Sequence, residues 1–140
     1  MADFADMTIL LVDDTPDNLY VMESALEDLG CQIFQADSGQ KALQMLAQRE
    51  FDLVLLDVQM PDMDGFEVAE LMKGSRKTKD VAIIFITAIN KEIKYIQKGY
   101  DVGAENYLFK PIEPEELRGK VEAALKYRRF KKLGVRKREE

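Results

Sequence analysis

Five side chains that could bind a cation or take part in catalysis follow short apolar runs in this 140-residue chain. Asp13 and Asp14 follow "ILLV", and Asp57 follows "LVLL". Thr87 follows "IIFI", and Lys110 follows "YLF". If these runs are parallel strands, their carboxyl ends meet at one edge of an open sheet. We therefore expect the five side chains to face a single pocket.

The expected pocket gathers three carboxylates, which repel one another. At about 4 to 5 Å and an effective dielectric near 20, each pair costs roughly 3 to 4 kcal/mol. A hard divalent cation relieves this repulsion, and Mg²⁺ is expected because it takes one or two carboxylates plus phosphate oxygens and keeps several waters. Together with an ammonium and a hydroxyl, the pocket has the parts for phosphoryl transfer. Asp57 is the most openly presented carboxylate and is a competent covalent nucleophile.

Short runs rich in Val, Ile, Leu and Phe alternate with segments of helical period, which is typical of βα units around a parallel sheet covered on both faces. The sequence predicts five such units in one α/β domain. The expected strands are Thr8 to Val12, Gln32 to Gln35, Leu53 to Leu56, Val81 to Ile86 and Asn106 to Phe109.

Helix starts are indicated by proline at a first helical position, by a capping serine and by glycine after a turn. The expected starts are Pro16, Ser38 with Gly39, Gly65, Lys91 and Pro114. Gly30 should end the first helix, and the fourth is expected over Lys91 to Lys98. The last helix should turn Leu117, Val121 and Leu125 inward.

The composition excludes several classes of protein. With 46% hydrophobic residues, the chain can bury the core of one domain. It has no histidine, which removes the commonest general base and any internal phosphohistidine. The single Cys31 cannot form an internal disulfide, and no leader is evident, so a cytoplasmic location is expected. The longest mostly apolar stretch, Val81 to Ile89, is about half of the roughly 18 residues that a membrane span needs.

Charge divides the chain into an acidic body and a basic tail. Residues 126–140 hold eight of the 20 Lys and Arg residues and two of the 26 acids, which leaves the first 125 residues with 12 bases and 24 acids. Such a tail could bind nucleic acid or an acidic membrane, or be a solvated face. Tyr127, Phe130 and Leu133 continue at spacing three, which favours a helical connector that extends the last helix before Gly134.

Four motifs in this order resemble the receiver domain of bacterial two-component response regulators. They are "LVDD" (11–14), "LLDVQMPDMDG" (55–65), "FITA" (85–88) and "YLFKP" (107–111). The resemblance covers about residues 7–127. It implies a single-domain (βα)5, flavodoxin-like, three-layer sandwich with a parallel five-stranded sheet of order 2-1-3-4-5. The receiver would span residues 1–127, and residues 128–140 would be a basic extension.

The resemblance also implies roles for individual residues. Asp57 would accept a phosphoryl group from a phosphohistidine on a separate sensor histidine kinase or histidine phosphotransfer protein. Mg²⁺ would be bound by Asp13, Asp14, Asp57 and the main-chain carbonyl of Gln59. Lys110 would contact the phosphoryl oxygens. The lack of histidine fits, because the phosphoryl donor would be on another protein.

The resemblance further implies a switch of conformation. Thr87 would turn its hydroxyl toward the aspartyl phosphate, and Tyr107 would follow by turning inward. This would remodel the face formed by the fourth helix, fifth strand and fifth helix, which would contact a downstream output protein or domain, or a second copy. No DNA binding by this domain and no membrane contact are expected. The chain would be a phospho-switch, acting as a catalyst only on its own phosphorylation and dephosphorylation.

Other interpretations remain open at this point. Asp13 and Asp14 alone could cap a helix, and Asp62 and Asp64 are expected to be turn residues. An aspartyl-phosphate phosphatase of the haloacid dehalogenase type also uses a strand-end Asp, Mg²⁺, Thr and Lys, although its acids form a D-x-D motif. A degenerate receiver and a flavin-binding protein are further alternatives. We also hypothesise that the chain is a receiver cut from a multidomain regulator or hybrid kinase.

Overall fold

The computed structural model describes residues 4–88, 97–98, 101, 104 and 106–139 and contains one parallel five-stranded sheet. The strands lie in the order β2-β1-β3-β4-β5, which confirms the predicted flavodoxin-like order. Their bounds are β1 Thr8–Val12, β2 Gln32–Ala36, β3 Leu53–Asp57, β4 Ala82–Thr87 and β5 Asn106–Phe109. Each strand lies within one residue of its predicted position.

The position of the three central strands in the sheet explains why their sequences are almost continuously apolar. Strand β3 pairs with β1 on one side and with β4 on the other, and all the residues of β3 and β4 are buried. A parallel strand that is covered on both faces has no solvent side, so it cannot alternate polar and apolar residues. The apolar runs therefore determine which strands are central.

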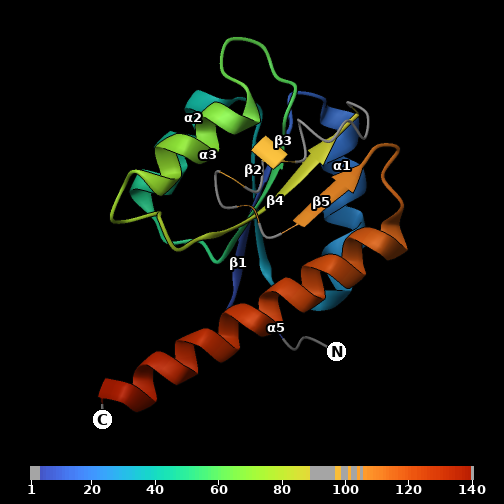
Figure 1. Ribbon diagram of the computed structural model, residues 1–140. Coiled ribbons are helices and arrows are strands. Elements are labelled where there is room, and N and C mark those ends of the chain that lie inside the picture. The colour runs from blue at the N-terminus through green and yellow to red at the C-terminus, as the bar shows by residue number, and fades with distance from the viewer. Residues whose placement is uncertain (1–3, 89–96, 99–100, 102–103, 105, 140) are drawn as a thin grey trace.

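Helices cover both faces of the sheet, as Figure 1 shows. Helices α1 (Pro16–Leu26) and α5 (Pro114–Glu139) pack on one face, where Leu117, Val121 and Leu125 are fully buried as predicted. Helices α2 (Gly39–Gln48) and α3 (Gly65–Lys73) contribute to a second apolar cluster on the other face. The three-layer sandwich is therefore confirmed.

Local signals set several of the helix ends. The 3₁₀ turn η1 (Glu27–Leu29) extends α1 and ends at Gly30, whose φ of 75° lies in the left-handed region. The Ser38 hydroxyl accepts a hydrogen bond from the Lys41 amide, as expected of a cap. Asp64 is not merely a turn residue, because it forms a reciprocal capping box with Glu67 at the start of α3.

The last helix is longer than the sequence indicated. We expected a connector that stopped before Gly134, but α5 continues through that glycine to Glu139. Figure 1 shows its C-terminal part projecting beyond the sheet. Among the described residues, no helix combines the length and the apolar character that crossing a bilayer requires. The predicted fourth helix, over Lys91 to Lys98, lies largely outside the described residues.

Candidate functional site

The three predicted metal-binding carboxylates come together at the carboxyl ends of two neighbouring strands. Asp13 follows β1 directly, and Asp57 is the last residue of β3. Oxygens of Asp13, Asp14 and Asp57 all lie within 4.8 Å of one another. Asp13 and Asp57 are buried, whereas Asp14 is exposed at the rim. The acidic pocket, defined here by these three residues, is thus open to solvent on one side.

Lys110 reaches into the acidic pocket from the loop after β5. Its Nζ lies 3.3 Å from Asp13 Oδ2 and 3.3 Å from Asp57 Oδ1. The Lys110 amide donates a hydrogen bond of 3.0 Å to the carbonyl of Thr87, which fixes the start of this loop against β4. The peptide bond to Pro111 is cis. Two carboxylates therefore share a single ammonium group.

Asp57 is held in a setting that disfavours its negative charge. Its pKa is raised from 3.8 to about 6, mainly by burial and next by the charge of Asp13, while the Lys110 ammonium acts in the opposite direction. Its Oδ1 is buried and has no hydrogen-bond partner among the described residues, although Lys110 makes an ion-pair contact with it. Oxygens of this kind fit a hard cation, which neutralises the charge and uses the free lone pairs.

Asp13 has a structural role as well as a place in the acidic pocket. Its Oδ1 accepts a 2.9 Å hydrogen bond from the Thr15 amide, and Asn18 Nδ2 lies 3.3 Å from its Oδ2. Thr15 is the N-cap residue of α1 but makes no side-chain capping bond. The helix-cap interpretation is thus partly right for Asp13, which holds the first turn of α1. Asn18 was missed in the sequence, because no motif marks it.

Two other predicted site residues lie beside the acidic pocket. Thr87 is the last residue of β4 and is 3% exposed. Gln59 is exposed, two residues beyond Asp57 in the loop that leads to α3. In the same loop, the Gly65 amide donates a 2.9 Å hydrogen bond to the Val58 carbonyl, which folds the loop back on β3. A ligand role for the Gln59 carbonyl and a switching role for Thr87 stay predictions.

Tyr107 occupies an inward position in β5. Its side chain is 4% exposed, and its ring centre lies 5.6 Å from that of Phe85 and 6.0 Å from that of Phe109. Lys120 of α5 donates a 2.8 Å hydrogen bond to its carbonyl. Tyr107 is therefore part of the apolar cluster on this face of the sheet, and its switching role stays a prediction. The part of the switch surface formed by the fourth helix lies outside the described residues.

Together, the fold and the acidic pocket define a flavodoxin-like domain with a candidate cation-binding and phosphoryl-accepting site at the carboxyl edge of its sheet. More specifically, residues 9–122 match the model of the response regulator receiver domain. The chain belongs to this family. It is a receiver domain of two-component signal transduction, as the four motifs implied.

Similar proteins agree with this assignment. A probable cyclic di-GMP phosphodiesterase of Vibrio cholerae is 40% identical over 95% of this chain and 30% of its own length. The signal transduction histidine-protein kinase BarA of Escherichia coli is 39% identical over 79% of this chain and 12% of its own length. The solved chemotaxis protein CheY4 of Vibrio cholerae is 30% identical with a TM-score of 0.79, covering 84% of this chain and 98% of that one. The chain spans less than a third of the length of the first curated relatives that it matches.

Proposed function

We propose that Asp57 accepts a phosphoryl group from a phosphohistidine on a partner kinase or phosphotransfer protein. One observation supports this most directly: the Asp57 carboxylate lies at the end of β3, within 3.3 Å of the Lys110 ammonium and beside two further carboxylates. An anionic phosphoryl group can approach a carboxylate only where positive charge offsets the repulsion. A Mg²⁺ bound in the acidic pocket, together with Lys110, would supply that positive charge.

Each residue of the site would have a different role in the transfer. A carboxylate oxygen of Asp57 attacks phosphorus, the P–N bond to the donor imidazole breaks, and its electron pair leaves on the imidazole nitrogen. Mg²⁺, held by the carboxylates and the carbonyl of Gln59, would supply charge neutralisation to the transferring oxygens. Lys110 shifts from the carboxylates toward a phosphoryl oxygen, and Thr87 donates its hydroxyl to another. Tyr107 stays inward and stabilises that arrangement.

The transfer is tested by intact mass spectrometry after incubation with acetyl phosphate and Mg²⁺. One added phosphoryl group is expected on the wild-type chain and none on Asp57→Asn. Asp62→Asn is the matched control, because Asp62 is an exposed acid in the same loop and asparagine tolerates its φ of 69°. No adduct on the wild type, or an adduct that survives Asp57→Asn, would refute the assignment.

Removal of the rim carboxylate should weaken metal binding without harming the fold. Asp14→Ala removes an exposed member of the acidic pocket, so we expect Mg²⁺ affinity to fall about tenfold or more while the melting temperature without Mg²⁺ holds or rises slightly. Calorimetric titration with Mg²⁺ measures the affinity. The control is Asp17→Ala, another exposed acid nearby, in the first turn of α1. Equal Mg²⁺ affinity in the two variants would contradict a metal role for Asp14.

We expect Asp13 to behave differently from Asp14. Alanine at position 13 would remove the acceptor of the Thr15 amide as well as a ligand, so it should also destabilise the fold. Asp13→Asn keeps an acceptor oxygen and is the better test of the charge.

The rest of the signalling role is part of the same proposal. The chain would catalyse no reaction beyond its own phosphorylation and dephosphorylation, and it would work in the cytoplasm. The surface of β5 and α5 would contact an output protein, an output domain or a second copy. Because several relatives are much longer chains, we propose that this receiver works within a multidomain regulator or hybrid kinase. The phosphatase alternative is not favoured, and turnover of a generic phosphatase substrate would revive it.

A further inference from the structure

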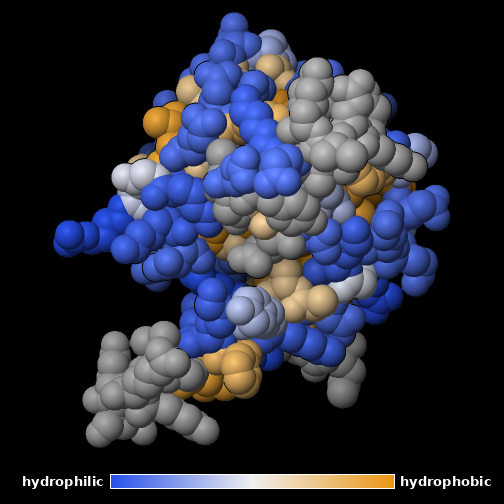
Figure 2. All heavy atoms as spheres, in the orientation of Figure 1, coloured by the Kyte–Doolittle hydropathy of each residue, from blue (hydrophilic) through white to orange (hydrophobic). Residues whose placement is uncertain are grey.

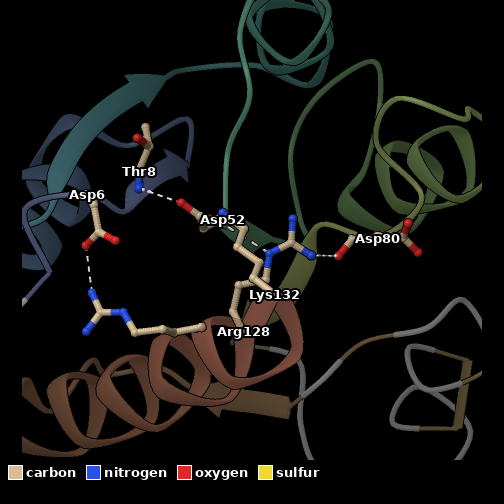
Figure 3. A network of polar contacts seen from close by, with 7 residues as sticks. Asp6, Thr8, Asp52, Asp80, Arg128 and Lys132 are labelled. Carbon is tan, nitrogen blue, oxygen red and sulfur yellow. Dashed lines mark hydrogen bonds and ion pairs between the residues drawn. The ribbon is translucent and has the colours of Figure 1, made fainter. Parts of the chain in front are cut away.

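The C-terminal half of α5 passes the edge of the sheet formed by the amino ends of the strands, opposite the acidic pocket. Figure 3 shows basic side chains of α5 pointing toward Asp52, which lies immediately before β3 and is 5% exposed. A buried carboxylate is expected only where it is well paired. The partners of the Asp52 carboxylate therefore show which part of α5 is fixed at this edge of the sheet.

Both carboxylate oxygens of Asp52 are engaged. Lys132 Nζ donates to its Oδ1 at 2.5 Å, and Arg128 Nε lies 3.5 Å from the same oxygen. The Thr8 amide donates to its Oδ2 at 2.9 Å. Arg128 also donates to the carbonyl of Asp80, in the segment before β4. Two consecutive turns of α5 are thus attached to the segments that precede β3 and β4.

A second attachment reinforces the first. Arg129 Nη2 donates to Asp6 Oδ1 at 2.7 Å, and its guanidinium lies 4.9 Å from the centre of the Phe4 ring. Figure 3 shows Asp6 near the contacts of Asp52. The basic residues at positions 128, 129 and 132 are thus used within the molecule, which gives part of the basic tail an intramolecular role.

The acidic pocket lies at the other edge of the sheet, where β3 ends and where a short segment joins Lys110 to α5. Strand β3 has Asp57 at its carboxyl end and Asp52 directly before its first residue, and Asp52 is fixed by main-chain bonds to Thr8 and Ala82 on both neighbouring strands. Helix α5 begins at Pro114, four residues after Lys110. One rod, about 27 Å long between Pro114 and Lys132 at the usual rise per residue, therefore starts close in sequence to Lys110 and is held at Asp52 further along.

We propose that Asp52, Arg128 and Lys132 form a latch, and that α5 is a lever between this latch and the acidic pocket. The lever rests on the proposed function: when Lys110 shifts toward a phosphoryl group on Asp57, the start of α5 is displaced. The helix then pivots on its buried apolar side chains, and the displacement strains the latch.

The consequence is a change in the direction in which α5 leaves the body. The helix continues from the latch to Glu139, and three large apolar side chains in the latch turns and next to them are half or more exposed, namely Tyr127, Phe130 and Leu133. Figure 2 shows hydrophobic atoms on this projecting part, among mostly hydrophilic ones. The latch would therefore set the direction in which α5 carries these side chains, and Asp52 is a positioning residue for that direction.

The latch is tested first without any phosphoryl donor. Asp52→Asn keeps an oxygen for the Thr8 amide but loses the charge that holds the two cations of α5. Because that position is buried, Arg128→Gln with Lys132→Gln provides a second variant from the helix side. In both, hydrogen exchange of the amides of residues 128–133 should become about tenfold faster or more. Wild-type exchange rates in both variants would overturn the latch.

A matched control separates the latch from a general loss of positive charge. Lys126→Gln with Lys131→Gln removes two charges from the same part of α5. Lys126 pairs with Glu122 on the helix itself, and Lys131 lies over the ring of Tyr127. This control should exchange as the wild type does. Equally fast exchange in the control would overturn the specific role of Asp52.

The lever is tested by a distance measured before and after phosphorylation. Spin labels at Gln48→Cys, the exposed end of α2, and Leu133→Cys, in a Cys31→Ser background, report the position of α5 against the body. Acetyl phosphate and Mg²⁺ should shift the distance distribution, and Asp52→Asn should broaden it before any addition. An unchanged distance with the adduct verified by mass would overturn the lever. Failure to form the adduct would instead overturn the proposed function and the lever that rests on it, while the exchange experiment still decides the latch.

Discussion

Asp57→Asn is expected to raise the free energy of unfolding by about 3 kcal/mol at pH 7 in the absence of divalent cations. Burial and the neighbouring Asp13 raise the pKa of Asp57 from 3.8 to about 6, in spite of Lys110. Each pKa unit corresponds to about 1.4 kcal/mol of difference between the two protonation states. Ionised Asp57 therefore destabilises the fold, and a neutral amide of the same shape removes this cost.

The sign and the pH window follow from linkage. Between pH 4 and 6 the folded state keeps the proton of Asp57 while the unfolded state has released it, so the stability of the wild type falls as the pH rises through this range. The asparagine variant lacks this titration. The stability difference between the two proteins should therefore be small below pH 4, grow up to about pH 6, and stay constant above it.

Urea denaturation of both proteins with a chelator present, at several pH values, measures this difference. Addition of Mg²⁺ should reduce it, because a cation in the acidic pocket stabilises the carboxylate but gains little from the amide. Asp62→Asn, in the exposed part of the same loop, should show no such pH dependence. An equal gain at pH 4 and pH 7 would mean that the charge of Asp57 is not the cause.

Gly65→Ala is expected to destabilise the fold by about 2 to 4 kcal/mol and to slow phosphorylation of Asp57. A Cβ atom at Gly65 would lie 2.3 Å from the carbonyl oxygen of Asp57 and 3.0 Å from the Cα of Val58. Both contacts are with backbone, so no side chain can rotate away and the loop must move. That movement displaces the carboxylate that we propose to be phosphorylated.

The matched control is Gly119→Ala, in the second turn of α5. A Cβ atom there has nothing within 4 Å, so this substitution should stabilise the protein by up to about 1 kcal/mol through helix propensity. Urea denaturation measures both variants, and the rate of acetyl phosphate labelling reports the effect on Asp57. Similar stability changes in the two variants would contradict the close approach of α3 to β3.

Much of the fold was predictable because its signals are local. Apolar runs placed all five strands within one residue, since strands buried on both faces cannot contain polar residues in their middle. Pro16 and Ser38 marked helix starts correctly. The predicted end of α5 was wrong, because Gly134 is a helix-ending signal only where the surrounding structure lets the chain turn. Asp64 was underestimated because its partner Glu67 was not considered.

The sequence by itself determined the class of domain and the meeting of Asp13, Asp14, Asp57 and Lys110, because parallel strands place their carboxyl ends at one edge. Only the tertiary structure decided how readily Asp57 ionises and what each group contacts. The raised pKa of Asp57 requires its burial beside Asp13. The contact between Asp52 and Lys132 joins residues 80 positions apart, and neither has a local pattern that marks it. Such pairs depend on how layers pack, which no periodicity along the chain records.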